Sequence, residues 1–165
     1  MLTSAMAYTL LRFGIPLRGA IDIGDLVELL IDNGSMNKAS ILLGKGLTRA
    51  YKLENLQQWS GCLISAGAIE HFRNLDIPEK DRLTLENLVN TKTLLQYRVP
   101  LKGGKIQEYY VLNWPFYFET KPTEDEIRNY FKMHNKVIDT WDVENKIKNT
   151  INFINYSFTL QKNGS

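Results

Sequence analysis

Residue types that cross-link chains or hold metals are scarce in this sequence. Of its 165 residues one is a cysteine, Cys62, which excludes an internal disulfide. The two histidines, His71 and His134, lie far apart in the chain, whereas a structural zinc site needs several ligands at short spacing. Neither a disulfide-stabilised nor a zinc-dependent domain is therefore expected.

Long hydrophobic runs and an excess of one charge are also missing. No apolar stretch approaches the roughly 20 residues that span a bilayer, and the first residues lack the basic and apolar regions of a secretion signal. Twenty Lys and Arg stand against 18 Asp and Glu, mixed along the chain, which gives no electrostatic reason to expect nucleic acid. We expect a cytoplasmic protein whose partners include neither a membrane nor a nucleic acid.

Apolar residues, in contrast, are plentiful. Hydrophobic residues make up 44% of the chain and aromatic residues 11%, enough for one hydrophobic core in a chain of ordinary domain length. The order of strand-like and helix-like patterns predicts an α+β domain, an α/β sandwich, that ends in two amphipathic helices. We divide it into an α/β core over 1–120, a helical extension of the same domain over 121–160, and a disordered tail over 161–165.

Periodic apolar residues predict the elements of the N-terminal half. The expected order is a helix over 2–13 ended by Gly14, a strand over 17–24, a segment over 26–31 that extends this strand or pairs with it, a turn at 33–35, and a helix over 47–56. On that last helix Leu47, Ala50 and Tyr51 share one side. Leu53 and Leu56 extend this stripe, which we expect to be buried.

The C-terminal half follows from similar signals. The expected order is a buried strand over 61–65, a helix over 66–72, a surface connection over 76–86, a hairpin around Gly103-Gly104, a helix opened by a capping box at Thr123, and a last helix over 143–158. The helix after Thr123 is expected to present one apolar side, made of Ile127, Tyr130, Phe131, His134 and Ile138. On such a side His134 is a packed side chain rather than a base or metal ligand.

The turn Gly44-Lys45-Gly46 before the helix over 47–56 is a candidate phosphate site. A glycine turn exposes backbone N–H groups, and the helix dipole favours an anion there. The spacing differs from that of a Walker motif. The alternative interpretation is a tight strand-to-helix turn that needs glycine for backbone reasons.

Other polar residues give weaker signals. Asp22, Asp25, Glu28 and Asp32 could supply oxygen ligands to a metal, but Asp22 and Asp25 fall on opposite faces of a regular strand, which favours a solvated acidic edge. Ser65 follows a buried strand without the Gly-x-Ser-x-Gly elbow of a hydrolase. No self-contained hydrolase, dinucleotide or zinc site is predicted.

Two stretches of the sequence, 14–24 and 44–54, together carry a resemblance to a known protein family. They read Gly14-Ile15-Pro16-Leu17-Arg18-Gly19-Ala20-Ile21-Asp22-Ile23-Gly24 and Gly44-Lys45-Gly46-Leu47-Thr48-Arg49-Ala50-Tyr51-Lys52-Leu53-Glu54. The pair resembles the later part of a class III nucleotidyl cyclase catalytic domain, and it is similar to bacterial cyclase-like proteins that include the pyrimidine cyclases of anti-phage signalling. The hairpin from Leu95 onward and the segment 146–151 also look like that group. This resemblance implies a ferredoxin-like, cyclase-type sheet covered by helices.

The resemblance also implies a chemistry. In that family two Mg²⁺ or Mn²⁺ ions, held by two aspartates, help to convert a nucleoside triphosphate into a cyclic nucleotide and pyrophosphate. Those aspartates lie upstream of the strand that matches 18–21, where this chain has only a predicted helix. Their roles are therefore not transferred to Asp22 or Asp25, and this chain alone is expected to bind no metal and to be inactive.

The nucleotide-binding residues that the resemblance implies are Lys45, Thr48, Lys52 and Arg18. Thr48 and Lys52 take the places of an Asn and an Arg that contact ribose and triphosphate in purine cyclases of this class. Arg49 lies on another side of the helix and serves as the comparison residue. Because family active sites lie between two protomers, a homodimer is expected.

Two functional hypotheses follow. In the first, the chain is the major part of a cyclase-like domain whose intact form makes a cyclic nucleotide in a homodimer. In the alternative, it is a catalytically incomplete module that keeps the fold for dimerisation or nucleotide sensing. An unrelated α+β protein with coinciding short motifs is a third, weaker possibility.

Overall fold

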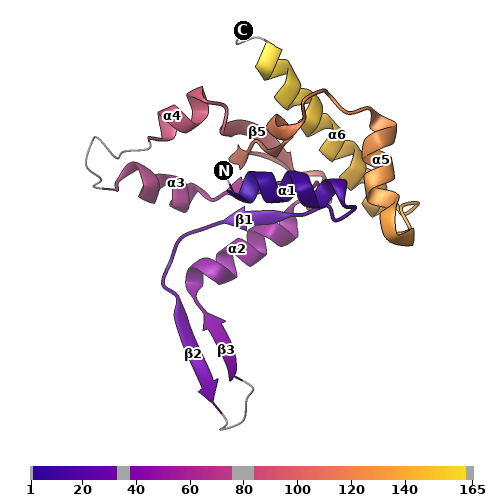
Figure 1. Cartoon of the computed structure of the whole chain (residues 1–165). Helices are drawn as coiled ribbons and strands as arrows, with labels where there is room; N and C mark the ends of the chain where they lie inside the picture. Colours follow the sequence, from indigo (N-terminus) through magenta and orange to yellow (C-terminus); the bar gives the residue numbers. More distant parts are fainter. Residues whose placement is uncertain (1, 33–37, 76–83, 163–165) are drawn as a thin grey trace.

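A mixed four-stranded β-sheet forms the centre of this α+β protein (Figure 1). The computed structural model describes residues 2–32, 38–75 and 84–162. Within them lie six α-helices and two β-sheets. In chain order these elements are α1 (Leu2–Arg12), β1 (Gly19–Ile21), β2 (Val27–Asp32), β3 (Lys38–Leu43), α2 (Lys45–Leu56), β4 (Cys62–Ile64), α3 (Ala66–Arg73), α4 (Leu85–Asn90), β5 (Leu94–Pro100), β6 (Ile106–Leu112), α5 (Glu124–Lys132) and α6 (Trp141–Lys162).

The strand order in the sheet is β1-β4-β6-β5. β1 runs parallel to β4, with Gly19 opposite Cys62, and the remaining neighbours are antiparallel. A parallel pair requires a crossover connection. Here that connection contains the separate hairpin β2–β3 followed by α2.

Helices cover both faces of this sheet. Adjacent residues of a strand point to opposite faces, so Leu95 and Leu94 mark the two sides of β5. Leu95 belongs to the main core, which α1, α5 and α6 complete and in which the Trp59 and Phe153 rings meet edge to face at 4.6 Å. Leu94 instead packs with Cys62, Leu112 and side chains of α4. The predicted α+β class with two C-terminal helices is thus confirmed.

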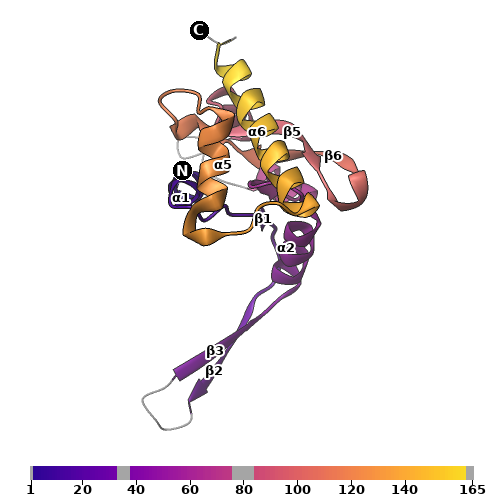
Figure 2. The same ribbon diagram turned by 90° about the vertical axis from the view of Figure 1, so that its right-hand side faces the viewer.

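The hairpin β2–β3 stands away from this body (Figures 1 and 2). Its strands pair in antiparallel register from Val27 opposite Leu43 to Asp32 opposite Lys38. The segment over 26–31 therefore pairs with the run that ends at Leu43, and it neither extends nor pairs with β1, contrary to both predicted options. The predicted turn at 33–35 lies outside the described residues.

β1 is also shorter than the strand predicted over 17–24. After Ile21 the backbone N–H of Ile23 donates to Oδ1 of Asp22 at 2.7 Å. The strand thus ends where an Asp side chain bonds to nearby backbone, a local bond of the kind that competes with regular structure. Only Gly19–Ile21 remain in the sheet.

The C-terminal half follows the prediction more closely. The hairpin β5–β6 turns at Gly103 and Gly104, both at φ 73°, a left-handed conformation that favours glycine. Thr123 and Glu126 form the predicted capping box. Part of the predicted connection over 76–86 is instead the start of α4, capped by Thr84, while 76–83 lie outside the described residues.

The prediction of a continuous apolar side on the helix after Thr123 was wrong at the C-terminal end of that helix. α5 ends at Lys132, and His134 adopts a left-handed conformation at φ 63°. His134 and Ile138 therefore leave the helix stripe. His134 is exposed, not packed, and its Nε2 lies 2.8 Å from the carbonyl oxygen of Phe13.

Among the residues that the structure describes, no helix combines the length and apolar character needed to cross a membrane. α6, the longest, is amphipathic and continues through Lys162. Residues 163–165 at the end of the predicted tail lie outside the described part.

Candidate functional site

The glycines before α2 allow two backbone segments to approach each other closely. A Cβ atom on Gly44 would lie 2.2 Å from the carbonyl oxygen of Asp25, and one on Gly46 would lie 2.8 Å from the backbone nitrogen of Gly24. Both distances are far below normal contacts. The geometry therefore supports the alternative interpretation of this turn, in which glycine is needed for packing, and it leaves phosphate binding as a prediction.

Lys45, Thr48 and Lys52 share one exposed side of α2. Their spacing of three and four residues places them on neighbouring turns, and all three are exposed. The hydroxyl of Thr48 donates to the carbonyl oxygen of Gly44 at 3.0 Å. Neither lysine forms an ion pair with a described residue, so both ammonium groups are available to an anion.

The predicted buried stripe of α2 was wrong for three residues. Leu47, Tyr51 and Leu56 are 50%, 66% and 48% exposed. Only Ala50 and Leu53 of the expected stripe are partly covered. α2 therefore presents a mixed surface that exposes three large apolar side chains as well as the cationic ones.

Arg18 does not join Lys45, Thr48 and Lys52. Its Nε lies 2.5 Å from Oε1 of Glu54, and its Nη1 donates to the carbonyl oxygen of Gln57 at 3.0 Å. Glu54 follows Lys52 by two positions, which is about 200° around a helix. The structure thus brings three of the four predicted nucleotide-binding residues together and places the fourth on the other side of α2.

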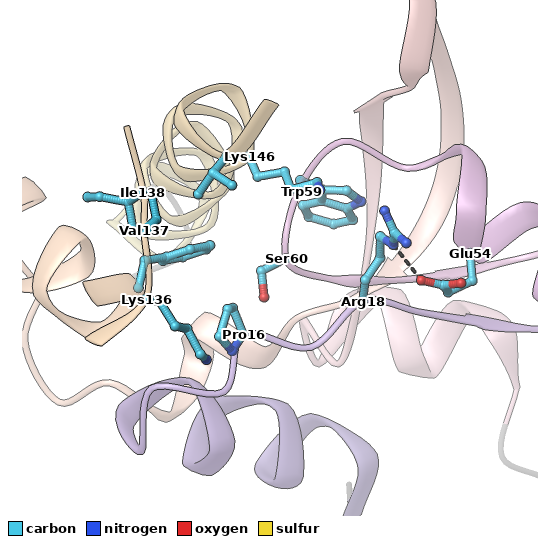
Figure 3. Close-up of a pocket in the computed structure, with 11 residues that line it drawn as sticks. Pro16, Arg18, Glu54, Trp59, Ser60, Lys136, Val137, Ile138 and Lys146 are labelled. Carbon is cyan, nitrogen blue, oxygen red and sulfur yellow. Dashed lines mark hydrogen bonds and ion pairs between the residues drawn. The ribbon is translucent and has the colours of Figure 1, made fainter. Parts of the chain in front are cut away.

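Arg18 lines a separate pocket of about 550 Å³ (Figure 3). Lys136 and Lys146 line it as well, from the connection before α6 and from α6 itself. Each cation already has a partner: Arg18 binds Glu54, Lys136 donates to the carbonyl oxygen of Gly14, and Lys146 lies 2.5 Å from Oδ2 of Asp142. The three cations that line this pocket are therefore held by partners within the protein.

Sequence reasoning missed Lys136 and Lys146 for a physical reason. They line the same pocket as Arg18, from the connection before α6 and from α6, on the side away from the Arg18–Glu54 pair (Figure 3). No local spacing signals that residues more than a hundred positions apart in sequence line one pocket.

Asp22 is enclosed rather than solvated, which corrects the predicted acidic edge at this residue, while Asp25 and Glu28 are exposed as predicted. The side chain of Asp22 is 3% exposed and lies 2.9 Å from Nε of Arg49. The hydroxyl of Ser65 also donates to it, at 2.8 Å. Burial by itself raises the pKa of Asp22, but hydrogen bonds from Arg49, from the N–H of Ile23 and from Ser65 outweigh burial and lower it below its ordinary value.

Arg49 is therefore a structural residue and not a neutral comparison residue. It joins α2 to the segment after β1 through Asp22 and also donates to the carbonyl oxygen of Ile23. Ser65, for which no hydrolase role was expected, caps α3 by accepting a hydrogen bond from the N–H of Ala68.

The carboxylate of Asp22 is already engaged by partners within the protein. The oxygens of Asp22 are taken up by Arg49, Ser65 and Ile23. Within 2–32, 38–75 and 84–162 no three side chains of the metal-binding types lie together. We therefore derive no catalytic step through a metal.

No protein-family model, curated protein or solved structure matches this chain. The function must be argued from the chain's own surfaces.

Proposed function

We propose that this chain is a cyclase-like module that forms a homodimer through the hairpin β2–β3 and binds a nucleoside triphosphate beside α2. The observation that carries the proposal is the hairpin surface. Side chains at alternate positions of paired strands share a face, so one face carries Val27, Leu29, Ile31, Ile41 and Leu43. We name these five residues the apolar face. Each is between 43% and 54% exposed.

An isolated two-stranded ribbon of this kind is marginal in water. Contiguous exposed apolar side chains on an ordered element mark an interaction surface. The apolar face contains no charged residue. It therefore gives no reason to expect a partner protein of opposite charge. A second copy supplies a matching apolar face across a two-fold axis, as self-complementary dimer interfaces do.

Two hairpins packed face to face would form a small β-sandwich, with about 10 Å between the ribbons. α2 follows β3 directly, joined by Gly44. Its exposed Leu47 and Tyr51 extend the available apolar surface. The cations Lys45 and Lys52 then lie close to the interface between the copies, where a triphosphate would meet both an ammonium pair and the start of a helix.

Sedimentation velocity of two matched variants tests the proposal. Leu29→Glu places a charge on the apolar face, and Leu30→Glu places the same charge on the opposite face of the same strand, where Leu30 lies opposite Ser40. We expect the wild type and Leu30→Glu to be dimeric and Leu29→Glu to be monomeric. A wild type that remains monomeric over the whole accessible concentration range would overturn the proposal. If Leu29→Glu and Leu30→Glu reduced dimer formation equally, the choice of the apolar face as the interface would be overturned.

Cyclase activity of an intact form is the second candidate function. The two cyclase-like stretches, which include β1 and much of α2, contact each other in the fold, and this supports it. The chain, with and without any further coding segment, is incubated with all four nucleoside triphosphates and Mn²⁺, and the products are identified by mass spectrometry. A cyclic nucleotide made only by a longer form supports this candidate, and none from any form rules it out.

A further inference from the structure

A second cavity, of about 390 Å³, lies between the β5–β6 turn and the start of α6. It contains none of the predicted nucleotide-binding residues. Lys102 and Lys105 line it from the turn, and Trp141, Asn145 and Asn149 line it from successive turns of α6. Figures 1 and 2 place α6 on the body of the protein, away from the projecting hairpin.

Trp141 gives this cavity an aromatic wall. It is 81% exposed, whereas Trp59 and Trp114 are each 1% exposed in the core. An indole left open to solvent beside a cavity contributes nothing to the core of this copy. Its face is available for stacking with a planar ring, a contact that any nucleobase can make.

Lys102 and Lys105 give the cavity a cationic edge. They flank Gly103 and Gly104, where an added Cβ would meet no atom within 4 Å. Neither lysine forms an ion pair with a residue of the described ranges. The charge of Lys102 acts on the carboxylate of Asp142, which lines the same cavity and is paired with Lys146. The two ammonium groups of this short, open turn together attract an anion such as a phosphate.

Gln58 lines the cavity and has a buried acceptor without a partner. The side chain is buried, with Gln58 only 7% exposed, and its Nε2 donates to two oxygens of Asp142, the carbonyl at 3.2 Å and Oδ1 at 2.6 Å. These two bonds fix the orientation of the amide. Its Oε1 is left without a hydrogen-bond donor in the part of the chain that the structure describes, although buried acceptors are normally paired.

Asparagine amides complete the polar lining. Asn149 donates to the carbonyl oxygen of Gln58 at 2.8 Å, which holds Gln58 to α6. Asn145, one turn earlier, makes no hydrogen bond through its side chain to a described residue. Its amide can both donate and accept, as the edge of a nucleobase requires.

We infer that this cavity binds a nucleoside phosphate, with the base stacked on Trp141 and the phosphate between Lys102 and Lys105. The aromatic wall matches the base, the two lysines match the phosphate, and the free amide of Asn145 can bond to the edge of the base. The site is separate from the α2 surface and does not depend on the proposed dimer.

Calorimetric titration with each of the four ribonucleoside monophosphates tests the inference. We expect saturable binding of at least one of them, weakened about tenfold by Trp141→Ala, as for loss of a stacked base, and much less by Trp141→Phe. The double variant Lys102→Ala/Lys105→Ala should lose at least as much. Ribose 5-phosphate, which lacks the base, should bind about tenfold more weakly than the monophosphate.

Lys132→Ala, at an exposed position of α5, is the matched control, and it should leave monophosphate binding unchanged. Absence of saturable binding by all four monophosphates would overturn the inference, as would wild-type affinity in both Trp141→Ala and the double lysine variant. Loss of binding in Lys52→Ala alone would assign the nucleotide to α2, which overturns this site and supports the proposed function. A single-stranded oligonucleotide that binds more than a hundredfold more tightly than any monophosphate would overturn the choice of ligand.

Discussion

The carboxylate of Asp22 connects three segments of the chain. It accepts hydrogen bonds from Arg49 of α2, from the cap residue Ser65 of α3 and from the backbone of Ile23. A carboxylate removed from water needs such partners, because an unpaired buried charge is costly. This single side chain therefore helps to set how α2 and α3 lie beside β1.

Arg49→Ala should destabilise the fold, because it removes the charged partner of Asp22. We expect a loss of about 1 kcal/mol in the free energy of unfolding, the low end for a charge-assisted bond because Arg49 is half exposed. Urea denaturation measures this value. Lys148→Ala, at an exposed position of α6, is the control, and equal stability of the two variants would contradict the role given to Arg49.

The same carboxylate predicts a dependence of stability on pH. The pKa of Asp22 is lowered in the folded protein, so its contribution is fully present above the unfolded value of about 3.9 and is lost as pH falls through the lower folded value. Asp22→Asn should therefore reduce the loss of stability below about pH 4. Asp142 and Glu144 also have lowered pKa values. Part of the loss of stability at low pH should therefore remain in the Asp22→Asn variant.

Melting temperatures of the wild type and Asp22→Asn between neutral pH and about pH 3 measure this difference. Asp139→Asn, at an exposed carboxylate, is the comparison variant. If the melting temperature of Asp22→Asn fell with pH as steeply as that of the wild type, Asp22 would not be a source of the pH dependence of stability.

At the scale of elements, α2 combines packing on one side with an open cationic surface on the other. Glu54 and Leu53 face the body of the protein, where Glu54 binds Arg18 and Leu53 packs against the core. Lys45, Thr48 and Lys52 face solvent. Substitutions on the solvent-exposed side of such a helix leave its packing against the body of the protein intact.

Lys52→Ala should therefore weaken triphosphate binding and leave stability within about 0.5 kcal/mol of the wild type. The expected loss of binding free energy is about 1 to 3 kcal/mol, the range for a charge-assisted hydrogen bond. Calorimetric titration with magnesium triphosphates measures it, with Lys148→Ala as the control. Equal affinities, or no wild-type binding, would leave the start of α2 as a packing element only.

Elements with local signals could be predicted from the sequence. The Gly103-Gly104 turn needs a left-handed backbone, which glycine favours. The Thr123–Glu126 capping box pairs side chains with nearby backbone groups. Both signals lie within a few neighbouring residues of the sequence. α5 was predicted too long because apolar spacing continues to Ile138 while the backbone turns at His134. Apolar spacing alone does not report where a helix ends.

The candidate sites were less predictable, because they depend on contacts between distant segments. Glycine spacing indicated the start of α2, yet the partner of Arg18 and the enclosure of Asp22 come from tertiary packing. Leu47 and Tyr51 were expected to be buried because an apolar stripe looks the same whether it faces a core or a protein interface.

At the scale of the whole molecule, a packed body and a projecting ribbon have opposite surface properties. The body encloses Trp59, Trp114 and Phe153 in one core, while the hairpin exposes its apolar face along both strands. Burying such a face on association gains free energy in proportion to the apolar area removed from water. The central claim is therefore that two copies meet through their hairpins.

A dipolar distance measurement between spin labels on the two hairpins tests that claim most directly. Ser40→Cys puts the label on the face opposite the apolar one, and the native Cys62 should not compete, because burial raises the pKa of its thiol to about 11. We predict one well-defined distance between labels, which Leu29→Glu abolishes. A singly labelled chain with no intermolecular dipolar signal at any protein concentration would contradict the account.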